Sequence, residues 1–296
     1  MGRPASAGPV PLDFTGPSLP PGVILSRASA GTAYSAGGEI TSFGPDVPRF
    51  EHQPVTQAPL GLSVEPAASN IAHYAVASDV GWSALFTANT LLSLDAFGIF
   101  PGLEVAGGGA VWHRATTVGG GWAQSVPLRL KLWYQAGTSG RVRAGLRNQT
   151  AGTESALAGP VGALSESGNV AGSFTGTVNT DFGGGIFAVE ATFTPNADAA
   201  VSQIGVGPFS VVAGETVVVL GVQLEVGSKG TSFIESAGST ADRAADVLSL
   251  HHWTGIYDVA ISYSDGAAET RPVQPITPGF VLTPLAHRRV TGITLT

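Results

Sequence analysis

Aromatic side chains gather in one stretch of this sequence, close to groups that can bind hydroxyls. Aromatic faces stack on the apolar faces of sugar rings, while amide and guanidinium groups donate hydrogen bonds to sugar oxygens. The spacing therefore predicts a glycan-binding site in the middle of the chain. Its candidate residues are Trp112, Trp122, Trp133, Tyr134, Arg147, Asn148 and Gln149.

The environments of the three tryptophans can be predicted from local patterns. Residues 128–133 alternate between apolar and other side chains, which is typical of a strand with two different faces. Trp133 falls on the face of Arg129 and Lys131, so we expect it to be exposed or to lie at an interface. For Trp112 and Trp122 we favour the core, because large aromatic residues dominate burial in sandwiches.

Acidic residues offer no catalytic pattern. A glycosidase needs two carboxyl groups about 5–10 Å apart, and no local motif groups any two of the candidates. These are Glu104, Glu154, Asp181, Glu190 and Glu225. The motifs G-x-S-x-G, H-E-x-x-H and G-x-x-x-x-G-K-[ST] are also absent from the sequence. We therefore expect no enzyme, and keep a capsule-degrading glycan hydrolase as the less favoured alternative.

Metal ligands are sparse. The chain has no cysteine, its six histidines show no ligand spacing, and no D-x-D-x-D-G run occurs. No cofactor is expected. A calcium site built from backbone oxygens stays open, because such a site leaves no sequence pattern.

Composition excludes several classes of protein. A net charge of −7 argues against nucleic acid as the main partner. No stretch is apolar enough for a transmembrane helix, and residues 1–22 contain no apolar run typical of a signal peptide. With 43% hydrophobic and only 12% charged residues, the chain can bury a core and is not disordered.

Short β-branched segments separated by glycine clusters predict an all-β fold with a jelly-roll sandwich. The candidate strands are 84–90, 110–117, 126–135, 142–149, 185–194, 200–206 and 216–226. Glycine triplets at 107–109, 119–121 and 183–185 are expected to be sheet corners. Residues 242–248 are predicted to form a short helical turn.

The sequence suggests four parts. Residues 1–22 contain six prolines and predict an extended anchoring arm that docks on a partner subunit. Residues 23–66 predict hairpins, with a turn at Gly37-Gly38. Residues 67–248 form the predicted jelly roll. Residues 249–296 predict a small separate β module with an Asp265-Gly266 hairpin turn.

Two separated stretches carry a family resemblance. The first includes Val47-Pro48-Arg49-Phe50-Glu51-His52 and Leu60-Gly61-Leu62-Ser63-Val64-Glu65-Pro66. The second includes Gly221-Val222-Gln223-Leu224-Glu225-Val226-Gly227 and Thr240-Ala241-Asp242-Arg243-Ala244-Ala245-Asp246. Together they resemble phage and gene-transfer-agent appendage proteins of the head-spike or tail-fibre kind, with a carbohydrate-binding-module-like jelly roll between them.

The resemblance implies a virion structural protein, made in the bacterial cytoplasm and carried on the surface of a phage-like particle. Its implied partners are capsid or tail subunits through residues 1–22, other spike or fibre subunits in a homo-oligomer, and host cell-surface polysaccharide. A purely structural adaptor without glycan binding is the alternative. Within the two stretches, Arg49, Glu65, Glu225 and Arg243 are expected to form ion pairs that brace the fold.

Overall fold

The computed structural model describes residues 9–296, which form two compact units. Unit 2 comprises residues 68–242, and the described part of unit 1 comprises residues 9–67 and 243–296. Residues 9–296 contain no helix, and hence none that could span a membrane. The prediction of an all-β fold is confirmed.

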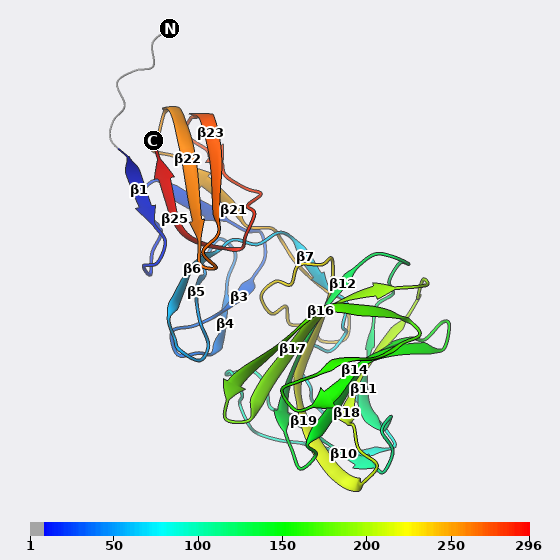
Figure 1. Ribbon diagram of the computed structural model, residues 1–296. Coiled ribbons are helices and arrows are strands. Elements are labelled where there is room, and N and C mark those ends of the chain that lie inside the picture. The colour runs from blue at the N-terminus through cyan, green and yellow to red at the C-terminus, as the bar shows by residue number, and fades with distance from the viewer. Residues whose placement is uncertain (1–8) are drawn as a thin grey trace. The chain divides into compact units, whose positions relative to one another are not determined.

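Unit 2 is a sandwich of two antiparallel sheets (Figure 1). The eight-stranded sheet has a main path β16-β17-β12-β19-β10-β9, and the six-stranded sheet runs β15-β14-β13-β18-β11-β8. The pairs β10·β19, β11·β18 and β12·β17 are nested in the sequence and alternate between the two sheets. This nesting is the rolled-up connectivity of a jelly roll.

The strands of the sandwich match the predicted ones closely. The strands that correspond to predictions are β8 (Trp82–Leu85), β9 (Thr87–Leu91), β11 (Arg114–Gly119), β12 (Leu128–Ala136), β13 (Arg141–Asn148), β17 (Ile186–Pro195), β18 (Ser202–Pro208) and β19 (Ala213–Val226). The strands without a predicted counterpart are β7 (Ala68–Asn70), β10 (Leu103–Gly108), β14 (Thr153–Pro160), β15 (Ser165–Asn169) and β16 (Gly172–Gly183). Rich in alanine, glycine and polar residues, β14 to β16 lack the β-branched pattern that identifies strands.

Two local predictions change in the structure. The single strand predicted over 84–90 is split at Phe86, whose φ of 57° lies in the left-handed region and turns the chain from one sheet into the other. The helical turn predicted over 242–248 is wrong, since β20 (Ala241–Arg243) and β21 (Val247–Leu250) occupy this stretch. The corner at 183–185 is confirmed, with all three glycines at positive φ between β16 and β17.

A segment after β19 covers the outer face of the eight-stranded sheet. Residues 231–234 are buried, and Gln223 fixes them by donating to the Ser232 carbonyl at 3.1 Å and accepting from the Ile234 amide at 2.7 Å. Glu225 accepts the Thr231 amide at 2.8 Å. The motif around 221–235 is therefore a strand followed by a strap that folds back over it.

Unit 1 joins the two ends of the described chain in one sheet. Its main path is β23-β22-β25-β6-β5, and β1 (Val10–Asp13) also pairs with β25. Figure 1 shows β1 in blue beside β25 in red. The remaining bounds are β2 (Val23–Ser26), β3 (Gly31–Tyr34), β4 (Ile40–Phe43), β5 (Phe50–His52), β6 (Pro59–Ser63), β22 (Gly255–Tyr263), β23 (Ala268–Ile276), β24 (Phe280–Val281) and β25 (Arg289–Leu295). The predicted turns at Gly37-Gly38 and Asp265-Gly266 join β3 to β4 and β22 to β23.

This arrangement differs from the predicted division of the chain. The hairpin region 23–66 and the module 249–296 are not two separate parts, because β6 pairs with β25 and β2 pairs with β21. Residues 1–8 of the predicted arm lie outside the described residues. Residues 10–14 belong to the unit itself, since Leu12 and Phe14 are buried in its core.

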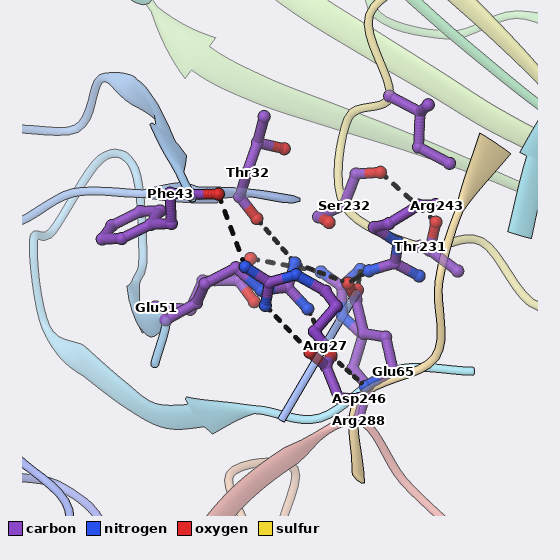
Figure 2. A network of polar contacts seen from close by, with 12 residues as sticks. Arg27, Thr32, Phe43, Glu51, Glu65, Thr231, Ser232, Arg243, Asp246 and Arg288 are labelled. Carbon is purple, nitrogen blue, oxygen red and sulfur yellow. Dashed lines mark hydrogen bonds and ion pairs between the residues drawn. The ribbon is translucent and has the colours of Figure 1, made fainter. Parts of the chain in front are cut away.

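A buried network of arginines and carboxylates forms the centre of unit 1 (Figure 2). Asp246 accepts from Arg27 at 2.9 Å and from Arg49 at 2.5 Å, and all three side chains are fully buried. Glu65 pairs with Arg49 at 2.9 Å and with Arg243. The bracing ion pairs predicted for Arg49, Glu65 and Arg243 are therefore confirmed.

The network extends to a third buried carboxylate. Glu51 pairs with Arg288 at 3.2 Å and with Arg289 at 2.8 Å. Burial raises the pKa of Glu51, but Arg288 and Arg289 together lower that pKa by more, so the carboxyl is ionised at neutral pH. Apart from Arg49–Glu65, each pair joins a residue before position 66 to one after position 242, so the network ties these two parts of the chain together.

Substitution Asp246→Asn is expected to destabilise unit 1 by about 3–5 kcal/mol, because it leaves the buried Arg27 guanidinium without its carboxylate and removes one of the two carboxylates that pair with Arg49. Asp265→Asn is the matched control: its side chain is half exposed at a hairpin turn, and we expect a change below about 0.5 kcal/mol. Urea unfolding of both variants measures the difference. Equal stability of the two variants would show that the network does not hold unit 1 together.

Candidate binding surface

The outer face of the six-stranded sheet carries an unusual row of arginines. Val142, Ala144 and Leu146 of β13 point into the sandwich core. Because side chains alternate along a strand, Arg141, Arg143 and Arg147 point outward. Arg114 of β11 and Glu154 of β14 lie on the same face. We call this set of outward-pointing residues the arginine face; it consists of Arg114, Arg141, Arg143, Arg147 and Glu154.

Glycines form the floor under these side chains. Gly145 pairs with Gly205, so the centre of this face has no side chains of its own. A Cβ at Gly205 would lie 2.3 Å from Cδ of Arg114, and one at Gly145 would lie 2.6 Å from Oε1 of Glu154. The two long side chains can therefore lie flat on the sheet and meet above it.

One carboxylate holds two of the arginines. Arg114 donates to both oxygens of Glu154, at 2.9 and 2.5 Å, and Arg143 donates to Oε1 at 2.8 Å. Burial lowers the pKa of Arg114, Glu154 opposes this, and nearby Arg143 and Arg147 lower it further. The last effect shows that positive charge is concentrated on this face.

The other two arginines of the face have no carboxylate partner within residues 9–296. Arg147 stands directly opposite Glu154 in the strand register, yet its guanidinium is only half-buried and forms no hydrogen bond or ion pair there. Its Nη2 lies toward Gly152 in the turn between β13 and β14. Arg141 is exposed and stacks on the ring of Phe209 at 5.2 Å.

Three aromatic rings lie where β8 and β11 meet the arginine face. Phe86 follows β8, and Trp112 and His113 immediately precede Arg114. Phe86 packs edge-on against Trp112 at 5.0 Å and stacks on His113 at 5.4 Å. Phe86 is 65% and Trp112 43% exposed, so this group, named the aromatic end, is open to solvent.

The structure overturns part of the predicted site. Trp133 does lie on the face of Arg129 and Lys131, but it is only 1% exposed, because Phe100 and Phe233 cover it at 5.6 and 5.5 Å. The expectation that Trp133 is exposed or lies at an interface is therefore wrong, since the fold itself buries it. Tyr134 is fully buried in the sandwich core, where its hydroxyl accepts the Gly162 amide.

The remaining predicted residues divide between core and surface. Trp122 is in the core, as expected, and its indole donates to the Ala197 carbonyl. Asn148 is buried and bonds Asp198 and Ala151. Gln149 and Arg147 reach solvent.

The core position favoured for Trp112 is wrong. The strand begins only at Arg114, and a turn closed by the His113 amide and the Ala110 carbonyl precedes it. Trp112 therefore lies in a loop rather than on the inner face of a strand.

Sequence reasoning missed Phe86, Arg141 and Arg143, which the structure places on this surface. The spacing of Arg141, Arg143 and Arg147 along one strand was a usable signal, since it places three cations on one face. No local signal marks Phe86, whose exposure follows from its left-handed turn between two sheets.

Three of the five acidic residues considered for catalysis, Glu154, Glu190 and Glu225, are already engaged. Lys131 lowers the pKa of Glu190 to about 2 despite burial, and Arg129 adds to this effect. Glu225 is buried and bonded to Thr231, while Glu154 holds Arg114 and Arg143. Among residues 9–296, no group of three or more metal-ligating side chains occurs.

Comparisons with known proteins give only distant structural likenesses. No protein-family model matches the sequence, and curated proteins give no significant match. A xylan-binding CBM22-1 domain of Xyn10C from Paenibacillus barcinonensis is 8% identical, with a TM-score of 0.36, over 57% of this chain and 99% of that one.

Two further solved structures are similarly distant. CBM22-1–GH10 modules of Xyn10B from Clostridium thermocellum are 11% identical, with a TM-score of 0.33, over 56% of this chain and 29% of that one. The mannan-binding module TmCBM27 is 16% identical, with a TM-score of 0.29, over 49% of this chain and 88% of that one. At TM-scores below 0.5, these likenesses carry neither a family nor a ligand over to this chain.

The glycine floor can be tested by substitution. Gly205→Ala should cost about 1–3 kcal/mol of unfolding free energy, because its Cβ would displace Arg114 from Glu154. Gly140→Ala, next to the same strand but with nothing within 4 Å of its Cβ, should change stability by less than about 1 kcal/mol. Urea unfolding compares them, and an unaffected Gly205→Ala would refute the flat packing of Arg114.

Proposed function

We propose that the chain is a glycan-binding protein that uses the aromatic end and the arginine face of unit 2. The observation that carries the proposal is that Phe86 and Trp112 pack together, both solvent-exposed, just before β11, whose first residue is Arg114 of the arginine face. Exposed rings supply stacking surfaces for sugars, and guanidiniums supply fixed hydrogen-bond donors. Sites of this kind bind without a deep cavity, as an extended polymer requires.

We propose binding without hydrolysis. A general acid must carry a proton at working pH, and a carboxyl with a pKa of about 2, such as Glu190, does not. The carboxylate oxygens of Glu154 and Glu225 accept hydrogen bonds from other residues of the fold. The prediction of a homo-oligomer is kept, since several weak sites on one particle gain from multivalency.

Substitution Trp112→Ala tests the proposed site. We expect at least an approximately tenfold loss of affinity for the polysaccharides that the full chain binds on an array of bacterial capsular glycans, because a stacking face disappears. Trp112→Phe keeps a ring at the same place and should retain most of the binding. If Trp112→Ala binds as well as the unchanged protein, the aromatic end is not the site.

We further propose that the protein works as a spike or fibre component on the surface of a phage-like particle, a class of particle to which gene-transfer agents belong. The support is the sequence resemblance over residues 12–66 and 215–250. Arg49, Glu65 and Arg243 in these stretches build the network of unit 1, so the shared residues support folding and leave recognition to the segment between them.

Peptide mass spectrometry of particles purified from the source organism tests this role. The chain should co-purify with capsid or tail proteins through a density gradient, at a constant ratio across the particle peak. Its absence from particles that are intact by electron microscopy would contradict the proposal.

A further inference from the structure

We propose that the glycan bound by this chain is anionic, and that Arg147 and Arg141 bind its carboxylate or sulfate groups. This inference rests on the proposed glycan-binding function and names the chemical class of its ligand. It follows from the charges on the arginine face, which a neutral sugar would leave uncompensated.

The face carries a surplus of positive charge. Four guanidiniums share a single carboxylate, Glu154, among the ion pairs of the described chain. Three of the four come from one strand, β13, whose outward positions are Arg141, Arg143, Gly145 and Arg147. Since like charges repel, gathering them on one face has an electrostatic cost that an anionic ligand would offset.

The four arginines fall into two roles. Arg114 and Arg143 are fixed by Glu154, which orients them across the glycine floor. Arg147 is held by the sheet on a half-buried site beside that cluster, and its guanidinium makes no hydrogen bond or ion pair with any described residue. Its donors are therefore available to a ligand, next to further positive charge from Arg143.

Arginine suits this role by its chemistry. The guanidinium stays charged at any physiological pH, and its planar fork matches two oxygens of a carboxylate or sulfate. Arg141, the outermost of the row, is exposed and already stacked on Phe209, which holds its fork in place. Arg141 and Arg147 stand six residues apart on one strand, about 20 Å, a spacing that fits charges repeating along a polymer.

The positive charge on the arginine face contrasts with the negative net charge of the whole chain. The chain carries a net charge of −7, so long-range electrostatics repel a polyanion. Binding of an acidic glycan must therefore depend on short-range contacts with this face. Its affinity should fall as salt rises, because the contacts are ionic.

The test compares charged polysaccharides with neutral counterparts of the same backbone, using the full chain and isothermal titration calorimetry. The probes are polygalacturonate against its carboxyl-reduced form, and dextran sulfate against dextran. We expect at least tenfold tighter binding of one charged member, and the member that binds shows whether the site takes carboxylate or sulfate.

Two variants and a DNA control complete the design. Arg147→Gln should weaken binding of the charged probe at least tenfold, whereas Lys229→Gln removes the same charge from the loop after β19 and should leave binding unchanged. Unchanged far-ultraviolet circular dichroism and melting temperature of Arg147→Gln would show that the loss is not unfolding. A single-stranded DNA of matched charge should bind at least tenfold more weakly.

The outcomes separate the two proposals. Equal binding of charged and neutral members, with Trp112 still required, overturns the anionic ligand and leaves glycan binding standing. Equal binding of DNA and polysaccharide, or equal effects of Arg147→Gln and Lys229→Gln, also overturns it. No binding to these probes or to the capsular array contradicts the glycan-binding function itself.

Discussion

A buried guanidinium needs an anionic partner, and this constraint organises the structure more than any other. In unit 1, Asp246 and Glu65 lie among Arg27, Arg49 and Arg243, all of them buried. The pairs require strands from both ends of the described chain to form one unit. A buried pair is weak as a source of stability, but breaking one is costly, so the network specifies which strands meet.

The same constraint explains the arginine face of unit 2. Arg114 is almost fully buried, and Glu154 crosses a floor of glycines to reach it. Arg147, next to them on β13, is less buried and is not paired within the described chain. The outer face of the other sheet differs, because the strap after β19 covers part of it and Glu190 pairs with both Arg129 and Lys131. Each of those two cations has a carboxylate partner within the fold, whereas Arg141 and Arg147 of the arginine face have none within residues 9–296.

Local patterns in the sequence predicted the fold class and most sandwich strands. The ion pairs of Arg49, Glu65 and Arg243 were expected within the two stretches that carry the family resemblance. Alternation over residues 128–133 placed Trp133 on the correct face of its strand. It could not reveal that Phe100 and Phe233, distant in sequence, cover that face. The prediction for Trp112 failed for the opposite reason. The strand begins a few residues later than predicted, after a turn, and Trp112 is therefore exposed to solvent. The union of both chain ends in unit 1 rests on long-range pairing, such as β1 with β25, which no window of sequence contains.

The central claim is that one surface of unit 2, formed by the aromatic end and the arginine face, recognises an acidic polysaccharide. Hydroxyl-radical footprinting of the full chain, with and without a bound polysaccharide, tests this most directly because it measures side-chain exposure residue by residue. The account predicts strong protection of Phe86 and Trp112, with no change at Val178 of β16 or Ile256 of β22, which are equally exposed in the free protein. Protection of Val178 or Ile256, with Phe86 and Trp112 unchanged, would contradict it.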